Sequence, residues 1–287
     1  VSFATAVFPL LSKLWESKET KEFLSRFSQT FLEVLYVAFP IGILIFILRQ
    51  PIVDIIYRTG RFDMSATAIT AACLGLYFIS TAVQCLVPIL LRGFFSIKNT
   101  FTPTVIALIN TLFNIIFFFV FVSLFGGGNH FGFNFFGHPV AFSLPAYLNG
   151  NNFLANGVKS FMGLNGVMDF PVLGLVLAFN LGLFLEFVLL FIYFYKKVGN
   201  FGLKEMWQSF LKILAGSAVM AAVAAFAFAK TGFLFKADFW GSLGQFVFIT
   251  LIAAGVYLLI TFALKSPEIK FLKKYFPILF PENGNEN

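Results

Sequence analysis

Apolar residues are concentrated in six long runs, separated by shorter stretches that carry most of the charge. The runs cover residues 29–48, 66–91, 103–125, 171–195, 207–229 and 239–264. A helix of roughly 20 residues rises about 30 Å, which matches the hydrocarbon thickness of a bilayer. Each run therefore predicts one membrane-spanning helix. The predicted fold class is all-α, a polytopic helical bundle with about six complete transmembrane helices.

The N-terminal residues predict a truncated span and a short interfacial helix. Residues 1–11 are apolar but too short to cross a bilayer, and the sequence starts at Val1 with neither an initiator Met nor the charged start of a signal peptide. We expect these residues to end a truncated helix, in a fragment that lacks its N-terminal part. Residues 13–28 alternate charged and apolar positions, which is typical of an amphipathic helix lying at the membrane interface.

Two segments do not have the composition of a span. Residues 126–170 are rich in Gly, Asn and Phe and predict an irregular extracytoplasmic loop. Within this loop His130 and His138 have no Cys or carboxylate nearby, so no metal site is expected. Residues 265–287 predict a basic, then polar, cytoplasmic tail. The chain thus divides into segments 1–125, 126–170, 171–264 and 265–287 of one membrane domain.

Composition and charge favour a membrane protein over a soluble one. Hydrophobic residues make up 59% and charged residues 11% of the chain, whereas soluble domains carry about 25% charged residues. The net charge of +7 does not indicate a nucleic-acid partner, because Lys and Arg lie in short connections beside the apolar runs. Such residues orient membrane spans by their excess on the cytoplasmic side. The excess lies on the side of residues 12–28, which predicts a multi-pass protein with a cytoplasmic C-terminus.

Three polar side chains within the runs are the candidate contacts for a substrate or an ion. Asn110 and Asn114 are four residues apart and share one helix face, and Glu186 lies near the middle of its run. Polar groups at this depth face protein or a water-filled cavity. The alternative role is structural, with Glu186 hydrogen-bonded to a neighbour such as Asn114. Pro40 frees a backbone carbonyl within its span, as a hinge or as a packing bend.

No pattern of catalytic chemistry accompanies these groups. The sequence contains no phosphate-binding loop, nucleophile elbow, metal-ligand cluster or dinucleotide fingerprint. We therefore expect no enzyme activity, no catalytic residue and no cofactor.

A set of residues in fixed order surrounds the second run. It comprises Arg58, Gly60, Phe62, Thr67, Ala68, Ala71, Leu74, Gly75, Leu76, Tyr77, Phe95, Ser96, Lys98, Asn99, Thr100, Thr102 and Pro103. This pattern resembles the MurJ/MviN lipid II flippases of the multidrug/oligosaccharidyl-lipid/polysaccharide exporter superfamily. We expect its most characteristic members to be structural: Arg58, Gly60, Phe62, Lys98, Thr102 and Pro103.

The resemblance implies the C-terminal lobe of a two-lobe flippase. Such a protein moves an undecaprenyl-linked peptidoglycan precursor, lipid II, from the inner to the outer leaflet of the bacterial inner membrane by alternating access. Its implied partners are membrane lipid, the undecaprenyl-linked saccharide and the missing N-terminal lobe. The last two spans would line a groove for the lipid tail.

Three alternatives remain open beside the lipid II flippase. One is a flippase for O-antigen or another polysaccharide-lipid, and another is a membrane enzyme acting on polyprenyl phosphates, although the clustered acids or histidines that it needs are not visible. The third is a non-transporting scaffold, which two departures from the family keep open. Some members hold sodium with an Asn-x-x-x-Asp pair, but Phe118 stands where the Asp after Asn114 belongs. Glu186 stands where the family implies an amide.

Overall fold

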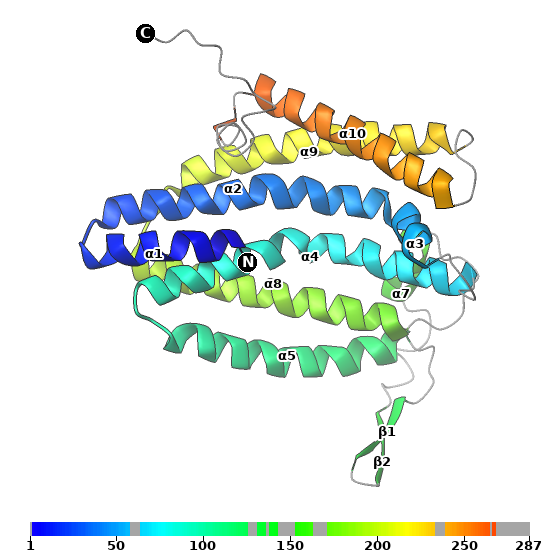
Figure 1. Ribbon diagram of the computed structural model, residues 1–287. Helices are drawn as coiled ribbons and strands as arrows, with labels where there is room; N and C mark the ends of the chain where they lie inside the picture. The colour runs from blue at the N-terminus through cyan, green and yellow to red at the C-terminus, as the bar shows by residue number, and fades with distance from the viewer. Residues whose placement is uncertain are drawn as a thin grey trace.

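The computed structural model describes residues 2–57, 64–125, 131–135, 138–142, 153–162, 171–232, 239–264 and 266–267. Most of the helices in this part of the chain lie side by side along one long axis (Figure 1). The long elements are α1 (Ser2–Glu16), α2 (Thr20–Ile47), α4 (Met64–Ser96), α5 (Phe101–Phe125), α8 (Pro171–Val198), α9 (Leu203–Thr231) and α10 (Phe239–Ala263). The short elements are α3 (Arg49–Tyr57), β1 (Phe131–Phe135), β2 (His138–Phe142) and α7 (Phe153–Met162).

The helices α2, α5, α8, α9 and α10 are long and apolar enough to cross a membrane. A sixth candidate span is α4, whose segments Ala66–Phe78 and Ser80–Ser96 meet at an angle of 47°. Each of the six apolar runs falls within one of these helices, apart from its last residue in two cases. The predicted fold class, an all-α polytopic bundle, is confirmed, with a small β-hairpin added to it.

The prediction of a separate interfacial helix over residues 13–28 is wrong. Residues up to Glu16 complete α1, and residues from Thr20 onwards are already the start of α2. The reason is the spacing of Phe23, Phe27 and Phe31, which lie four residues apart and are all buried in the main hydrophobic core. This apolar face continues directly into the span, so one helix forms instead of two.

The segment 126–170 is not wholly irregular, as the composition had suggested. The strands β1 and β2 form an antiparallel hairpin in which Phe131 pairs with Phe142. The alternation of Phe with Gly and Asn in residues 131–135 has the two-residue period of a strand. The helix α7 follows, and its Met162 packs into a second hydrophobic cluster with Leu76 and Leu173. The helix α7 therefore packs against α4 and α8 at one end of the bundle.

The opposite end of the bundle is formed by the turns between α1 and α2, α4 and α5, and α8 and α9 (Figure 1). Lys18 and Lys98 follow the ends of α1 and α4 in the left-handed conformation, with φ of 60° and 57°. In the second turn, Lys98 N donates to Phe95 O and Asn99 N donates to Phe94 O. This is a Schellman C-cap, a motif that usually places glycine where Lys98 stands.

The bundle packs in two parts on either side of α2 and α4. On one side, Gly93 of α4 leaves space for the rings of Phe27 and Phe194, whose centroids are 4.5 Å apart. These contacts hold α2, α4 and α8 together, and α5 packs mainly on α8. On the other side α9 and α10 form a pair that packs on α2 and α3. The outer face of α5 exposes large apolar side chains such as Leu108 and Leu112, which suits contact with lipid.

Candidate functional site

The three polar candidates of the sequence meet at the interface of α5 and α8. Asn110 Nδ2 donates a hydrogen bond of 2.7 Å to Glu186 Oε2. Asn114 Nδ2 donates to Asn110 Oδ1 at 2.9 Å and to the main-chain oxygen of Asn110 at 3.0 Å. All three side chains are partly buried. The carboxylate therefore bonds directly to Asn110, whereas the sequence had suggested Asn114 as a neighbour of Glu186.

Small residues on α8 allow this close approach. A methyl group added at Gly182 would collide with the side-chain amide of Asn114, and one added at Gly174 would collide with the backbone of Phe121. Gly174, Gly182 and Glu186 are separated by multiples of four residues, so they share one face of α8. On this face, two positions without a side chain and one carboxylate are turned toward α5. Small residues at such positions let membrane helices come close enough for side-chain hydrogen bonds.

An apolar groove of about 340 Å³ lies between α2, α4, α8 and α9. Its lining residues are Phe31, Leu32, Leu35, Phe39, Ala82, Val83, Leu86, Phe184, Phe187, Phe191, Leu203, Met206, Trp207 and Phe210. Aromatic and aliphatic walls without charge suit an apolar chain, and exclude a charged headgroup. The sequence predicted that the last two spans line a groove for a lipid tail. The helix α9 lines this groove, but no residue of α10 is among its lining residues in the described part of the chain.

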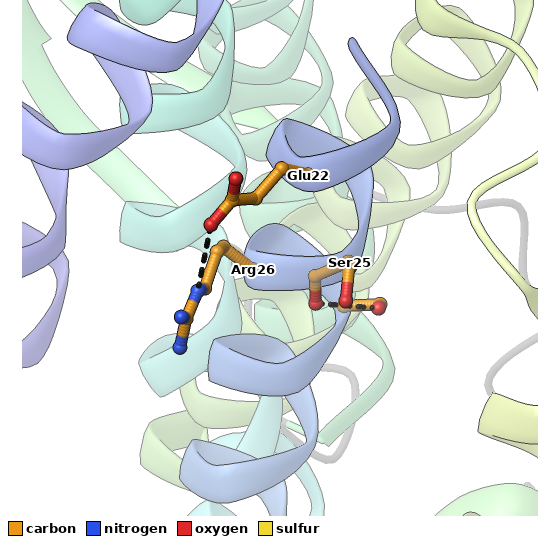
Figure 2. A network of polar contacts seen from close by, with 4 residues as sticks. Glu22, Ser25 and Arg26 are labelled. Atoms are coloured by element: carbon orange, nitrogen blue, oxygen red, sulfur yellow. Dashed lines mark hydrogen bonds and ion pairs between the residues drawn. The ribbon is translucent and has the colours of Figure 1, made fainter. Parts of the chain in front are cut away.

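A larger and more polar cavity, of about 950 Å³, opens at the end of the bundle that carries the basic turns. It is lined by α1, α2, α9 and the turn between α8 and α9, and it contains Lys21 and Arg26 beside Glu33 and Glu205. On α2 the guanidinium of Arg26 also lies near a carboxylate outside the lining, with 3.8 Å between Arg26 Nε and Glu22 Oε1 (Figure 2). Cations and carboxylates are mixed here, so the cavity has no strong preference for an anion.

The second part of the family motif, from Phe95 to Pro103, spans the turn between α4 and α5. Lys98 Nζ lies 3.0 Å from Glu16 Oε1, which joins the end of α4 to the end of α1. The side chain of Asn99 accepts a hydrogen bond from Thr102 N and donates to Thr102 Oγ1, and Pro103 is buried in the first turn of α5. Arg58, Gly60 and Phe62 lie outside the described residues. The motif around Lys98 is thus a capping sequence between two spans.

Sequence reasoning missed two buried polar side chains that form hydrogen bonds between helices. Asn180 of α8 is 3% exposed and donates to Leu76 O of α4 at 2.9 Å. Tyr257 of α10 donates to Tyr36 O of α2 at 2.8 Å. Asn180 lies in an apolar run, as Asn110 does, and that position was a usable signal. The Tyr257 contact had a weaker signal, namely the carbonyl that Pro40 frees four residues earlier.

No metal or cofactor site accompanies these groups among the residues whose structure is described, which contain no group of three or more His, Cys, Asp or Glu side chains able to hold a metal ion. Cys73 and Cys85 are free thiols on α4. The site consists of interhelical hydrogen bonds and an apolar groove. These features, with the long apolar helices around them, are those of a polytopic helical membrane protein.

Comparison with known proteins finds a family similarity in the N-terminal part of the chain. Residues 1–134 match the family model described as "Lipid II flippase MurJ". A probable lipid II flippase MurJ of Bdellovibrio bacteriovorus is 30% identical over 110 residues, which are 38% of this chain and 21% of that protein. A second probable lipid II flippase MurJ, of Buchnera aphidicola, is 30% identical over 108 residues, with the same shares. The matched part is therefore about a fifth of each relative.

The fold extends the similarity beyond the matched sequence. A solved structure of a lipid II flippase MurJ in an inward closed conformation superposes with a TM-score of 0.57 at 23% identity, over 93% of this chain and 44% of that one. The chain is, first, a bacterial polytopic helical membrane protein with the fold of this transporter class. More narrowly, residues 1–134 match the MurJ family model, and the chain has a fold similar to that of MurJ over 93% of its length.

Proposed function

We propose that this chain is one lobe of a flippase that transports lipid II from the inner to the outer leaflet for peptidoglycan synthesis. In this proposal it works by alternating access against a second lobe, which corresponds to the remaining length of the MurJ relatives. The chain then lies in the bacterial inner membrane, with its C-terminus in the cytoplasm. The reaction is transport without covalent catalysis.

The observation that carries the proposal is the apolar groove between α2 and α9, in a chain with MurJ sequence. The groove is bounded by Phe31 and Phe39 on α2 and by Trp207 and Phe210 on α9. A polyprenyl tail consists only of hydrocarbon, so its burial against such walls is favourable by about 25 cal/mol per Å². We assign the tail of the lipid to this groove and the saccharide and pyrophosphate to the interface with the second lobe.

In the same proposal, Asn110, Asn114 and Glu186 contact an ion or a polar group of the substrate during the conformational cycle. Support comes from the cost of placing a carboxylate within a span, which makes such a residue a functional candidate. The hydrogen bond from Asn110 to Glu186 supplies the resting partner.

Depletion of the full-length protein in its own bacterium tests the substrate. The expected result is accumulation of lipid II, measured by mass spectrometry of lipid extracts. Other undecaprenyl-linked saccharides are measured in the same extracts. Accumulation of an O-antigen or polysaccharide-lipid without lipid II would assign the chain to that other class of flippase, and accumulation of no lipid-linked saccharide would favour a scaffold.

A groove-filling pair tests where the lipid tail binds. Ala82 lines the groove, whereas Ala222 lies on an exposed face of α9. In the full-length protein, Ala82→Trp is expected to prevent growth in place of the normal gene, because the indole occupies the space of the tail. The matched variant Ala222→Trp is expected to support growth. Equal growth of the two strains, at equal protein levels in the membrane, would remove the groove from the proposal.

Reconstitution of this 287-residue chain in liposomes tests the need for a second lobe. Because the saccharide and pyrophosphate are assigned to the interface of two lobes, the chain alone is expected to bind a polyprenyl phosphate without moving lipid II across the bilayer. A fluorescent lipid II derivative and a membrane-impermeant quencher measure this. Transport above that of protein-free liposomes would contradict the two-lobe arrangement.

A further inference from the structure

The proline in α2 leaves one backbone carbonyl without its usual partner. In a helix the N–H of residue i donates to the carbonyl of residue i−4, and proline has no N–H. Pro40 lies inside α2, so the carbonyl of Tyr36 does not receive the hydrogen bond that a residue with an N–H at position 40 would donate. In a bilayer such a carbonyl is costly unless a neighbouring group satisfies it.

The missing donor comes from another helix, α10. The hydroxyl of Tyr257 donates a hydrogen bond of 2.8 Å to the main-chain oxygen of Tyr36. A second contact lies beside it, 2.8 Å between the hydroxyls of Tyr36 and Thr261. The rings of Tyr36 and Tyr257 have centroids 5.1 Å apart. Exposed fractions of 1% for Tyr36, 6% for Tyr257 and 0% for Thr261 show that water is excluded from this contact.

The same residues join α10 to α9. A methyl group at Gly216 of α9 would lie 3.1 Å from Thr261 Cγ2 and 3.4 Å from the ring of Tyr257. The two helices therefore pack closely at the level where Tyr257 reaches α2. The contact of α10 itself with α2 covers only a short stretch, and this hydrogen bond lies within it.

The position of the α9–α10 pair against α2 determines the apolar groove. Leu35 and Phe39 line the groove from α2, and they immediately precede Tyr36 and Pro40 in the chain. Met206 and Phe210 line it from α9, about three and about two turns before Gly216. A shift of the pair relative to Tyr36 therefore changes the distance between the two walls.

We infer that Tyr257 is a positioning residue, which holds the α9–α10 pair to the carbonyl freed by Pro40 and so sets the width of the apolar groove. The tail-binding consequence rests on the proposed function, whereas the positioning itself does not. If the role of Tyr257 is to supply the donor that proline removes, restoring an N–H at position 40 makes the hydroxyl of Tyr257 dispensable. A side chain that merely fills space would show no such dependence.

The test is a double-variant cycle on the full chain in lipid nanodiscs. The variants are Tyr257→Phe, Pro40→Ala and their combination, with Tyr193→Phe, which removes the hydroxyl of a tyrosine that is 49% exposed on α8, as the matched control. The α2–α9 distance is measured by electron spin resonance between labels on Ile41→Cys and Val219→Cys, both exposed positions, with Cys73 and Cys85 replaced by Ser. Binding of undecaprenyl phosphate is measured by quenching of Trp207, with Trp15 and Trp240 replaced by Phe.

Tyr257→Phe is expected to broaden the distance distribution and to weaken undecaprenyl phosphate binding by about threefold to fifteenfold, the range for one interhelical hydrogen bond in a membrane protein. Tyr193→Phe is expected to change neither. In the Pro40→Ala background, Tyr257→Phe is expected to leave the distribution unchanged and binding within about twofold, which is the usual limit of additivity for independent changes.

An effect of Tyr257→Phe that is equal in both backgrounds, or an unchanged distance distribution, would overturn the inference. If the single variant does not fold, the double variant decides: a folded double variant supports the role of Tyr257, and an unfolded one contradicts it. A wild-type chain that fails to bind undecaprenyl phosphate, while the distance effect and its rescue are both present, would refute tail binding and leave the positioning role standing.

Discussion

The side-chain amide of Asn180 on α8 donates a hydrogen bond of 2.9 Å to the main-chain oxygen of Leu76 on α4. Leu76 lies just before the point where the two segments of α4 meet at 47°. Pro88, the proline inside α4, is too far along the helix to free a carbonyl there, because a proline affects the residue four positions earlier. The bend therefore needs another cause.

Polar side chains around the bend supply that cause. The hydroxyls of Ser80 and Thr81 both donate to Tyr77 O, at 3.2 Å and 2.9 Å. Such bonds to the preceding turn, and side chains that insert into the helical ladder, bend helices. On the other side Gly42 of α2 packs against Thr81. The bent α4 is thus fixed between α2 and α8.

Replacing Asn180 by Leu is expected to destabilise the chain by about 1–2 kcal/mol, because it removes a buried interhelical hydrogen bond and leaves the branched chain to fit the space of a smaller amide. Thr111→Val is the matched control, because the Thr111 hydroxyl bonds only within α5 in an exposed position. Unfolding in detergent by heat or by sodium dodecyl sulfate measures the difference. Equal stability of the two variants would show that the Leu76 carbonyl gains nothing from Asn180.

The spans themselves follow from sequence, because burial in a bilayer requires long apolar helices and six runs have the length. The prediction of a separate helix over residues 13–28 failed because the charged residues of this segment indicate exposure, whereas its Phe residues pack in the core. Lys21, Glu22 and Arg26 indicate an exposed helix, yet Phe23 and Phe27 on the opposite face are completely buried. Charged residues near a span's end do not stop its helix when one face continues into the core.

Which helices pack together, and in which register, was harder to predict from the sequence than where the helices lie along the chain. The sequence places Asn110, Asn114 and Glu186 at the right depth, but which amide meets the carboxylate depends on the register of α5 against α8. That register depends on Gly174 and Gly182, because the missing side chains there leave space for the backbone of Phe121 and the amide of Asn114 on α5. The freed carbonyl of Tyr36 was predictable from Pro40, whereas its donor lies more than 200 residues away, at Tyr257.

Gly182 provides a direct test of this register. Gly182→Ala is expected to destabilise the chain by about 1–3 kcal/mol, because the added methyl group displaces the amide of Asn114 and disturbs its bonds to Asn110. Gly255→Ala in α10 is the control, because a methyl group there meets no atom within 4 Å. The control is expected to be neutral or to stabilise by up to about 1 kcal/mol, the helix preference of Ala over Gly. Equal losses in the two variants would contradict the close contact of α5 and α8.

Lys98 provides a test of the capping turn, and here a substitution is expected to stabilise. Its φ of 57° costs a residue with a side chain about 1 kcal/mol, which glycine avoids. Its ion pair with Glu16 is exposed, so that contribution is at most about 1 kcal/mol and falls with salt. Lys98→Gly is therefore expected to raise the melting temperature at high salt. Lys98→Val, which has a branched side chain, is expected to lower it at all salt concentrations. The same order for Lys18, at φ 60°, would confirm the shared cause.

Substitutions of Glu186 are expected to affect the stability of the chain and its transport activity differently. Glu186→Gln keeps an oxygen that accepts the hydrogen bond from Asn110 and removes the charge from the span, so the stability of this 287-residue chain is expected to stay within about 0.5 kcal/mol of the wild type or to rise. Glu186→Leu leaves the amide of Asn110 without that acceptor and is expected to cost about 1 kcal/mol. Both are measured by unfolding in detergent.

The same two variants, placed in the full-length protein, decide between the two roles that the sequence left open. If the carboxylate serves transport, Glu186→Gln folds normally and still causes lipid II to accumulate in growing cells, because an amide cannot take over the charge or proton exchange of a carboxylate. If Glu186 serves only to hold α5 on α8, Glu186→Gln transports normally and Glu186→Leu alone loses both stability and activity. Normal transport by both variants would exclude either role for this carboxylate.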